Sequence, residues 1–246
     1  MKSDIRHIEE AALNAWPALH TLVYDGWLLR FANGYTKRAN SVVPLYSGTR
    51  PLAEKILYCE KVYQQEKQPV IFRLPSFVEG VGDLDAALAA RGYRHLDETI
   101  VQMSDLGHAS YTQPDRAYTL LSPHLWLPLY HEMAQGRTDR ETHARLLQAI
   151  TNPTCYIAVM EAQPVACGLG VYDRGYVGLF DIVTDPAHRR QGYGMNVVSS
   201  LLAWGQQAYE AGYAYLQVMA NNAPAIHLYR KFGFEEGYRY WYRMKA

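Results

Sequence analysis

The sequence has little of what marks several common protein classes. It holds three cysteines in 246 residues, Cys59, Cys155 and Cys167, with no CxxC spacing between them. This argues against a disulfide framework or a thiolate metal site. The first residues lack the apolar stretch of a signal peptide, and no apolar run reaches the ~18 residues that a membrane helix needs. We therefore expect a cytoplasmic protein with no membrane partner.

The sequence also lacks an excess of charge of either sign. Lys+Arg and Asp+Glu both number 24, so the formal net charge is +0. A protein without an overall basic field has little to hold nucleic acid by counterion release, and we expect no nucleic-acid partner. Its 20 tyrosines are better explained as core and cleft lining than as base-stacking platforms.

Motifs for metal and serine chemistry are missing. His131-Glu132 begins like HExxH, but position 135 is Gln135. No Gly-x-Ser-x-Gly elbow is present for a serine nucleophile. We expect neither a catalytic metal nor an acyl-serine intermediate.

A basic, glycine-containing stretch, HRRQGYG at 188–194, precedes a segment with helical apolar spacing. The first turn of a helix has unpaired N–H groups and the positive end of the helix dipole, so glycine backbone there can close around an anion. The stretch is not a P-loop, because Met195 follows Gly194, and it is not a dinucleotide fingerprint, because position 197 is Val197. From these residues alone, an anion site and a simple strand-to-helix turn both stay open.

The second half reads as an antiparallel meander followed by alternating helices and strands. Asp173-Arg174-Gly175 predicts a hairpin turn, and Asn222 with Pro224 predicts a helix start. The expected elements are helices from Ser122-Pro123 and over 138–150, strands over 156–161, 165–171 and 176–183, a helix from Gly194 toward Gly212, a strand over 213–219, a helix from Asn222 to Gly233, and a strand over 238–243.

The first half has a similar outline. We expect a helix over 5–19, strands over 22–31 and 35–45 around the turn signal Asn33-Gly34, a helix over 51–67, a strand over 69–74, a helix over 83–91 and a strand over 96–103. Both halves end in strand, helix, glycine-aromatic and strand, which suggests an old duplication, although two halves alike by chance stay possible. The predicted boundaries are 1–103, a connector at 104–117, and 118–246.

Two segments of the second half carry a family resemblance. DIVTDPAHRRQGYGMNVVSSLLAWG contains Arg189-x-x-Gly192-x-Gly194, and NAPAIHLYRKFGF follows it. Together they resemble the signature of the GNAT superfamily of acetyl-CoA-dependent N-acetyltransferases over about residues 117–246. The first half resembles the degenerate first repeat of a tandem GNAT protein. The resemblance implies an α/β (α+β) fold with a mixed, mostly antiparallel central sheet and helices on both faces, built from two tandem repeats.

The resemblance implies that the anion is the pyrophosphate of acetyl-CoA. The backbone amides from Arg190 to Met195 would cradle it, with Arg189 near the start of the loop. The strand that contains Asp181 would offer backbone groups to pantetheine and would splay from the next strand. The implied coenzyme contacts are Ile182, Val183, Thr184, Arg189, Arg190, Gln191, Gly192, Tyr193, Gly194, Met195, Asn222 and Tyr229.

Two residues are candidates for chemistry. Tyr229 matches the family tyrosine beside the coenzyme sulfur, where it would donate to the leaving thiolate; otherwise it is a packed helix tyrosine. Asp181 is the one charge in an apolar strand. Because a buried carboxylate is costly unless it is paired, it either faces a cleft, where it binds the acceptor ammonium or acts as a base, or pairs with a nearby arginine.

Three other polar features have competing interpretations. His227 is expected to be a surface or packing histidine. Asn222 is expected to be both a helix cap and a wall of the site. The polar segment 37–41 (KRANS) lines the acceptor pocket between the repeats or, as we favour from the pattern, forms a solvated strand face.

The expected function is transfer of an acetyl group from acetyl-CoA to a primary amine by direct attack in a ternary complex. A non-catalytic acyl-CoA-binding or assembly module, and transfer of another acyl group, are the alternatives. The acceptor is a small-molecule or peptide amine, and amino acids, polyamines, aminoglycosides and protein N-termini all stay open. The sequence does not determine the oligomeric state.

Overall fold

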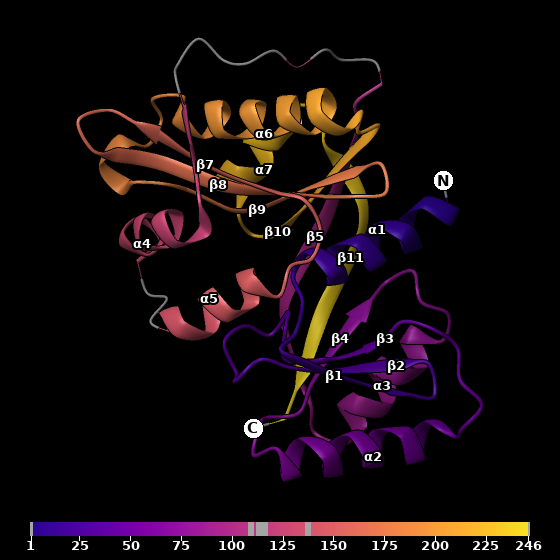
Figure 1. Ribbon diagram of the computed structural model, residues 1–246. Helices are drawn as coiled ribbons and strands as arrows, with labels where there is room; N and C mark the ends of the chain where they lie inside the picture. The colour runs from indigo at the N-terminus through magenta and orange to yellow at the C-terminus, as the bar shows by residue number, and fades with distance from the viewer. Residues whose placement is uncertain (1, 108–110, 112–117, 136–138, 246) are drawn as a thin grey trace.

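The strands of both halves of the chain join in one sheet. The computed structural model describes residues 2–107, 111, 118–135 and 139–245, with side chains from Ile5 onward. Within these residues eleven strands form a single sheet in the order β1-β2-β3-β4-β11-β5-β10-β9-β8-β7-β6. Figure 1 shows the helices packed against this sheet in both halves. The expected α/β class with a mixed central sheet is confirmed.

The first half contributes three helices and five strands among the described residues. Their bounds are α1 Lys2–Ala15, β1 His20–Tyr24, β2 Trp27–Phe31, β3 Val42–Pro44, α2 Leu52–Gln65, β4 Ile71–Pro75, α3 Val81–Ala90 and β5 Arg94–Asp105. Pro51 at the N-cap of α2 agrees with the preference for proline at a helix start, where its missing N–H costs nothing.

The second half contributes the remaining described elements. Their bounds are β6 Tyr118–Leu121, α4 Pro123–Met133, α5 Arg140–Gln148, β7 Thr154–Met160, β8 Pro164–Asp173, β9 Tyr176–Thr184, the 3-10 helix η1 Pro186–His188, α6 Tyr193–Tyr209, β10 Tyr213–Met219, α7 Ala223–Arg230 and β11 Glu235–Met244. Helix α6 ends earlier than its pattern indicates, because Glu210 takes the left-handed conformation (φ 52°) that we expected of Gly212.

Strand directions are symmetric about the centre of the sheet. Two neighbouring pairs are parallel, β3 with β4 and β9 with β10, and the other pairs are antiparallel. On the central side of each parallel pair lies a strand that runs antiparallel to its neighbour: β11 is antiparallel to β4, and β5 is antiparallel to β10. This symmetry agrees with the duplication that the sequence pattern suggests.

The two halves exchange their last strands. Strand β5 of the first half pairs with β10, and β11 of the second half pairs with β4. The two exchanged strands also pair with each other from Glu235 opposite Met103 to Met244 opposite Arg94. In Figure 1 the yellow β11 runs down among the purple strands of the first half. Sequence order alone does not predict this exchange.

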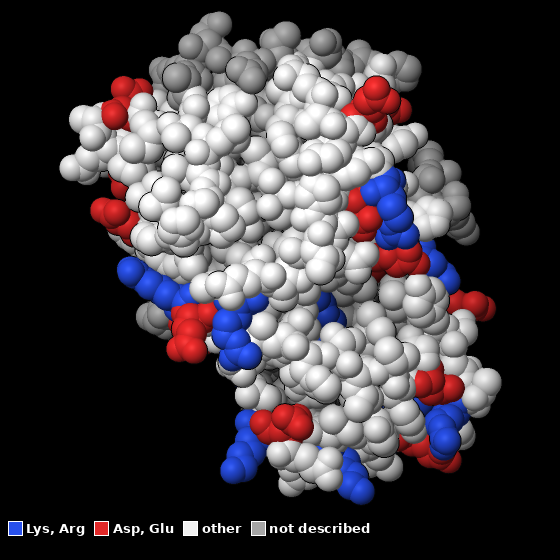
Figure 2. All heavy atoms as spheres, in the orientation of Figure 1, with Lys and Arg blue, Asp and Glu red and all other residues white. Residues whose placement is uncertain are grey.

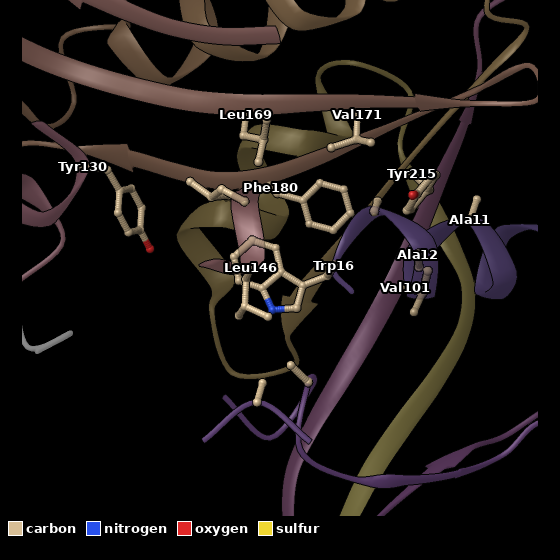
Figure 3. Packing of buried hydrophobic residues seen from close by; sticks show 14 of the residues in the cluster. Ala11, Ala12, Trp16, Val101, Tyr130, Leu146, Leu169, Val171, Phe180 and Tyr215 are labelled. Carbon is tan, nitrogen blue, oxygen red and sulfur yellow. The ribbon is translucent and has the colours of Figure 1, made fainter. Parts of the chain in front are cut away.

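The sheet is covered on both faces. One face packs against α1, α4 and α5 in a core shared by both halves, which includes Trp16, Trp126, Phe180 and Tyr240. The other face packs against α6 and α7 in the second half and against α2 and α3 in the first half. Figure 3 shows Trp16 beside Phe180, where the end of α1 meets β9.

Strand predictions in the first half need two corrections. The strand expected over 22–31 is a hairpin, because Asp25 and Gly26 both adopt positive φ (44° and 83°) and turn the chain between β1 and β2. The strand expected over 35–45 shrinks to β3. The buried Asn40 side chain accepts hydrogen bonds from the Ala32 and Gly34 amides (2.6 and 2.9 Å), so local bonds replace a strand ladder there.

Charges of both signs are interspersed over the surface. Figure 2 shows basic and acidic side chains side by side on the face it presents, with no broad field of one sign. Among the described residues, none of the helices combines the length and apolar character that a membrane span requires.

Candidate active site

A wedge opens where two neighbouring strands stop pairing. The parallel pairing of β9 with β10 runs from Tyr176 opposite Tyr213 to Leu179 opposite Leu216 and ends there, although both strands continue. Beyond that point residues of both strands line a cavity of about 480 Å³. Its other walls come from α4, α7, β11 and the first half, so the cavity lies between the two halves of the chain.

Asp181 stands at an irregularity of β9 that turns it toward this cavity. The register of β8 against β9 shifts between Cys167 and Leu169, and Asp181 opposite this shift has a φ of 45°. A bulge of this kind re-aims a side chain within a strand. The Asp181 side chain is 6% exposed, and its Oδ2 lies 3.0 Å from Nε2 of His143 on α5. Its partner is therefore a histidine and not the arginine considered above.

The contact continues into the protein through a second histidine. Nδ1 of His143 lies 3.1 Å from Nε2 of His131 on α4, and both rings are buried. The two histidines thus share one ring-nitrogen contact, in which the donor depends on the tautomer of each ring, and Nε2 of His143 lies at ion-pair distance from the Asp181 carboxylate. Trp16 and Tyr130 pack on the His143 ring at centroid distances of 5.5 and 5.3 Å, which fixes its orientation.

Tyr229 reaches the same cavity from α7. Burial raises the pKa of its hydroxyl to about 12, so the group stays protonated at neutral pH and can act as a donor. Asn222 caps α7 by accepting a hydrogen bond from the Ala225 amide at 3.3 Å, and it also lines the cavity. The expected cap is therefore observed, and the role of Asn222 as a wall of the site stays a prediction. His227, on the same helix, is exposed, as expected.

The glycine-containing loop forms the N-terminus of α6. Gly192 is the N-cap with a φ of 89°, a conformation that side chains disfavour, and a Cβ placed on it would meet no atom within 4 Å. Gly194 is closer to its surroundings, because a Cβ there would stand 3.3 Å from Leu228 and 3.5 Å from the Thr184 hydroxyl. The first glycine is thus favoured by backbone conformation, and a side chain at the second would meet Leu228 of α7 and Thr184 of β9 at close range.

The side chains of the loop point in different directions. Arg189, Arg190 and Gln191 are exposed, and Arg190 also has a positive φ of 62°. Tyr193 is buried and donates to a carboxylate oxygen of Glu161 at 2.9 Å, so only its backbone is available to a ligand. Because α6 begins at Tyr193, its first amides project toward this loop.

The predicted site residues divide into two neighbouring groups. Asp181, Ile182, Asn222 and Tyr229 line the cavity, and Val183 and Thr184 continue β9 away from it. The loop residues Arg189 to Met195 do not line the cavity but follow β9 after a short 3-10 turn at Pro186–His188, and Gly194 lies beside Thr184 and α7. A ligand that extends from the loop to the cavity would follow the edge of β9.

Several residues of the site were not recognised in the sequence. His143 and His131 come from α5 and α4, Trp16 follows the end of α1, and only the tertiary structure brings them to Asp181. The segment 37–41, which we expected to be a solvated strand face, instead turns inward: Lys37 and Arg38 line the cavity, and its last three residues are buried. One signal was available, because His143 shares a helix face with the apolar Leu146 and Leu147.

Comparison with known proteins covers nearly the whole chain. The family model described as "Probable histone acetyltransferase Rv0428c C-terminal" matches residues 2–243. YobR of Bacillus subtilis (strain 168), an uncharacterized N-acetyltransferase, is 31% identical over 250 residues, which cover 98% of this chain and 99% of YobR. The probable histone acetyltransferase Rv0428c of Mycobacterium tuberculosis is 33% identical over 132 residues, which cover 52% of this chain and 39% of that protein.

Solved structures agree with these relatives in fold. A GCN5-related N-acetyltransferase from Kribbella flavida superposes with a TM-score of 0.73 at 15% identity, covering 98% of this chain and 95% of that one. The chain belongs to the GNAT superfamily. A tandem GNAT protein from the clavulanic acid biosynthesis pathway matches with a TM-score of 0.62 at 13% identity, covering 80% of this chain and 70% of that one.

Membership of the GNAT superfamily makes the protein an N-acetyltransferase. The GNAT signature residues lie where the fold brings strand β9, helix α6 and helix α7 together. Asp181 and Tyr229 belong to the second half, and the cavity that holds them is lined by residues of both halves.

Proposed function

We propose that this GNAT protein transfers an acetyl group from acetyl-CoA to a primary amine by direct attack in a ternary complex. The observation that carries the proposal is the wedge between β9 and β10, which holds Asp181 and Tyr229 in one cavity beside the loop of α6. An amine and a thioester that bind in this wedge would lie in the same cavity as the Asp181 carboxylate and the Tyr229 hydroxyl. Holding both reactants in one cavity lowers the entropic part of the activation barrier of a bimolecular reaction.

The residues present fit acetyl-CoA. The open space at Gly192 and the unpaired first amides expected of α6 suit a pyrophosphate, and the exposed Arg189 and Arg190 add positive charge beside it. Backbone groups of Ile182, Val183 and Thr184 would pair with the amides of pantetheine, as an added strand would. When bound, acetyl-CoA supplies an activated acetyl group and a thiolate leaving group.

Tyr229 would stabilise the departing sulfur. With its pKa raised to about 12 by burial, it holds its proton throughout the neutral range. A free thiol has a pKa of ~8.5, so complete proton transfer from this tyrosine to a free thiolate is unfavourable. Its role is therefore a hydrogen bond to the developing negative charge, or donation concerted with C–S cleavage.

Asp181 would receive the amine. An alkyl ammonium with a pKa of ~10 must lose its proton before it attacks, at a cost of about 4 kcal/mol at neutral pH. The Asp181 carboxylate can bind the ammonium and accept that proton directly or through water. His143, held by His131, keeps the carboxylate in one orientation, so His143 acts as a positioning residue.

The cysteines favour direct attack over an acyl-enzyme. All three are buried, and burial raises the pKa of the Cys155 thiol to about 12 and that of Cys167 well above its usual range. A buried, protonated thiol is a poor nucleophile. Isolation of an acyl group on Cys155 or Cys167 would contradict the ternary-complex mechanism.

The test is calorimetric titration of acetyl-CoA into the wild type and Gly192→Asp. This variant puts a side chain and a negative charge into the phosphate loop. Gly175→Asp is the matched control, because Gly175 has nearly the same φ (88°) and equally open surroundings but lies in the β8–β9 turn. We expect micromolar binding that is lost only in the Gly192 variant, and release of free thiol when amines are added to the wild type.

Other results would separate the alternatives. Equal loss of binding in both glycine variants would mean that strain, and not the phosphate loop, is responsible. Binding of acetyl-CoA with no thiol release over a broad amine panel would favour a module that binds acyl-CoA without transfer. Turnover with a longer acyl-CoA but not with acetyl-CoA would mean that the enzyme transfers a different acyl group at the same site.

A further inference from the structure

The cavity contains four charged side chains, which divide between its two sides. Lys37, Arg38 and Asp97 belong to the first half of the chain, and Asp181 belongs to the second half. Trp16, Phe180 and aromatic residues of β11 line the space between them. Charges that face an aromatic cavity interact more strongly than charges in open water.

Three of these four charges already have partners. Lys37 Nζ lies 2.7 Å from Oδ2 of Asp97, so the two neutralise each other. Asp181 is held by His143 at 3.0 Å. Arg38 is different: within the described part of the chain its guanidinium has no carboxylate partner, and it lies over the Trp16 ring at 5.8 Å from the centroid.

The backbone that carries Arg38 is held in place. The Arg38 carbonyl accepts a hydrogen bond from Nη1 of the buried Arg30 at 2.8 Å. Asn40, two residues later, donates to the Thr36 carbonyl at 2.9 Å and accepts from two further amides. The backbone at Arg38 therefore has little freedom to lose on binding a ligand, and the guanidinium itself is placed by its contact with the Trp16 ring.

We propose that Arg38 binds a carboxylate of the acceptor, and that the acceptor is therefore a small amino acid-like molecule whose amine faces Asp181. The planar guanidinium matches a carboxylate in a two-point geometry. Arg38 is one cation without a carboxylate partner, and it suits a ligand group with one negative charge. A phosphate dianion would need a second cation, and Lys37 is already paired with Asp97. A polybasic peptide tail would bring further positive charge toward Arg38 and is disfavoured.

This inference rests on the proposed function, since it needs an amine at Asp181. The experiment titrates pairs of ligands that differ only in the carboxylate into protein saturated with coenzyme A. The pairs are phenylalanine with phenethylamine, leucine with 3-methylbutylamine, and lysine with cadaverine. We expect at least one amino acid to bind more than tenfold more tightly than its decarboxylated amine.

Substitution at Arg38 tests which residue supplies the preference. Arg38→Gln should weaken binding of that amino acid by about ten- to hundredfold, as expected for a charged hydrogen bond, and leave the decarboxylated amine unchanged. Arg38→Lys should retain part of the preference, because it keeps the charge without the two-point geometry. Arg145→Gln, which changes an exposed arginine on α5, should have no effect.

The outcomes distinguish this inference from the function on which it rests. Three results would overturn the carboxylate site: amines that bind as tightly as their amino acids, failure of every amino acid in the set to bind, or a preference that survives Arg38→Gln. In each of these cases, coenzyme binding would leave the proposed function intact. Weaker coenzyme binding in Arg38→Gln would assign the guanidinium to the coenzyme instead. Absence of coenzyme binding in the wild type would remove both proposals.

Discussion

At the scale of single residues, the site combines groups that one short stretch of sequence could not supply. Asp181 leaves the regular strand through a positive φ, and its partner His143 comes from a helix 38 positions earlier in the chain. Tyr229 enters from a third element, with a hydroxyl whose pKa burial raises to about 12. The proposed function of Asp181 and Tyr229 depends on their lining the same cavity.

Replacing Tyr229 by phenylalanine tests its role as donor. Tyr229→Phe should lower kcat by about 100-fold, in the range found when one acid or one hydrogen-bond donor is removed from a transition state. The coenzyme affinity measured by calorimetry should not change, because the ring remains. Tyr213→Phe, at an exposed tyrosine, is the control. A Tyr229→Phe enzyme of wild-type rate would mean that the hydroxyl only packs.

Replacing His143 tests whether it positions Asp181. His143→Phe keeps a ring between Trp16 and Tyr130 but removes both nitrogens, so we expect kcat to fall about tenfold or more while coenzyme affinity is kept. His143→Gln keeps an N–H donor and should recover part of the rate. The check is steady-state kinetics with melting curves for each variant. If both variants lose stability but keep kcat, the role of His143 is structural alone.

At the scale of elements, the two halves treat equivalent helix starts differently. In the first half, the turn before α2 is occupied by the chain itself: the Asp25 carboxylate accepts from the Thr49 amide (2.9 Å) and the Arg50 amide (3.0 Å) and pairs with Lys55 (3.0 Å). In the second half, the corresponding helix α6 begins with the open loop at Gly192. In the first half, the Asp25 carboxylate thus occupies the loop before α2. In the second half, we assign the equivalent loop before α6 to a phosphate of the coenzyme.

The Asp25 clamp predicts a pH dependence of stability. The Thr49 and Arg50 amides, with the Lys55 ammonium, hold the pKa of Asp25 well below its usual range. Its stabilisation is therefore complete above the unfolded-state pKa of ~3.9 and is lost as the pH falls below that value. Asp25→Asn should lower the Tm at pH 7, and the difference from wild type should shrink below pH ~4.

Differential scanning calorimetry from pH 3 to pH 8 measures this difference. Glu79→Gln, at an exposed acid near the same loop, should show no such convergence. A constant gap between wild type and Asp25→Asn down to pH 3 would show that the carboxylate charge is not what holds the turn.

At the scale of the whole molecule, the exchange of β5 and β11 joins the halves. Tyr238, Tyr240 and Tyr242 of β11 lie in the core beneath α1, and Tyr238 donates to Glu9, which also pairs with the buried Arg73 of β4. Neither half can complete its sheet without a strand from the other. The domain limits at 1–103, 104–117 and 118–246 stay a prediction, whereas the structural unit crosses them.

The exchange predicts that both halves unfold together. Calorimetry of the wild type should show one transition, with equal van't Hoff and calorimetric enthalpies. Glu9→Ala should lower that single Tm strongly, because removing one partner of a buried ion pair costs about 3–5 kcal/mol. Leu120→Ala, at an exposed leucine of the edge strand β6, should change the Tm little. Two resolved transitions would mean that the halves are independent despite the shared strands.

Local patterns made much of the second half predictable. The spacing of apolar residues after Gly194 predicts α6, and Asn222 with Pro224 predicts the start of α7, because caps and amphipathic faces depend on neighbours a few positions away. The first half was harder, since Asn40 replaces a strand by a turn through bonds that no periodicity reveals.

The sequence by itself determined the mixed fold class, the superfamily, the loop at Gly192 and the two candidate groups Asp181 and Tyr229, because these depend on short motifs. The tertiary structure alone decided the exchange of β5 and β11, the His131–His143–Asp181 contact and the entry of Arg38 into the cavity. Each of these joins residues far apart in the chain. Their meeting depends on how whole faces of helices and strands pack, which no local pattern encodes.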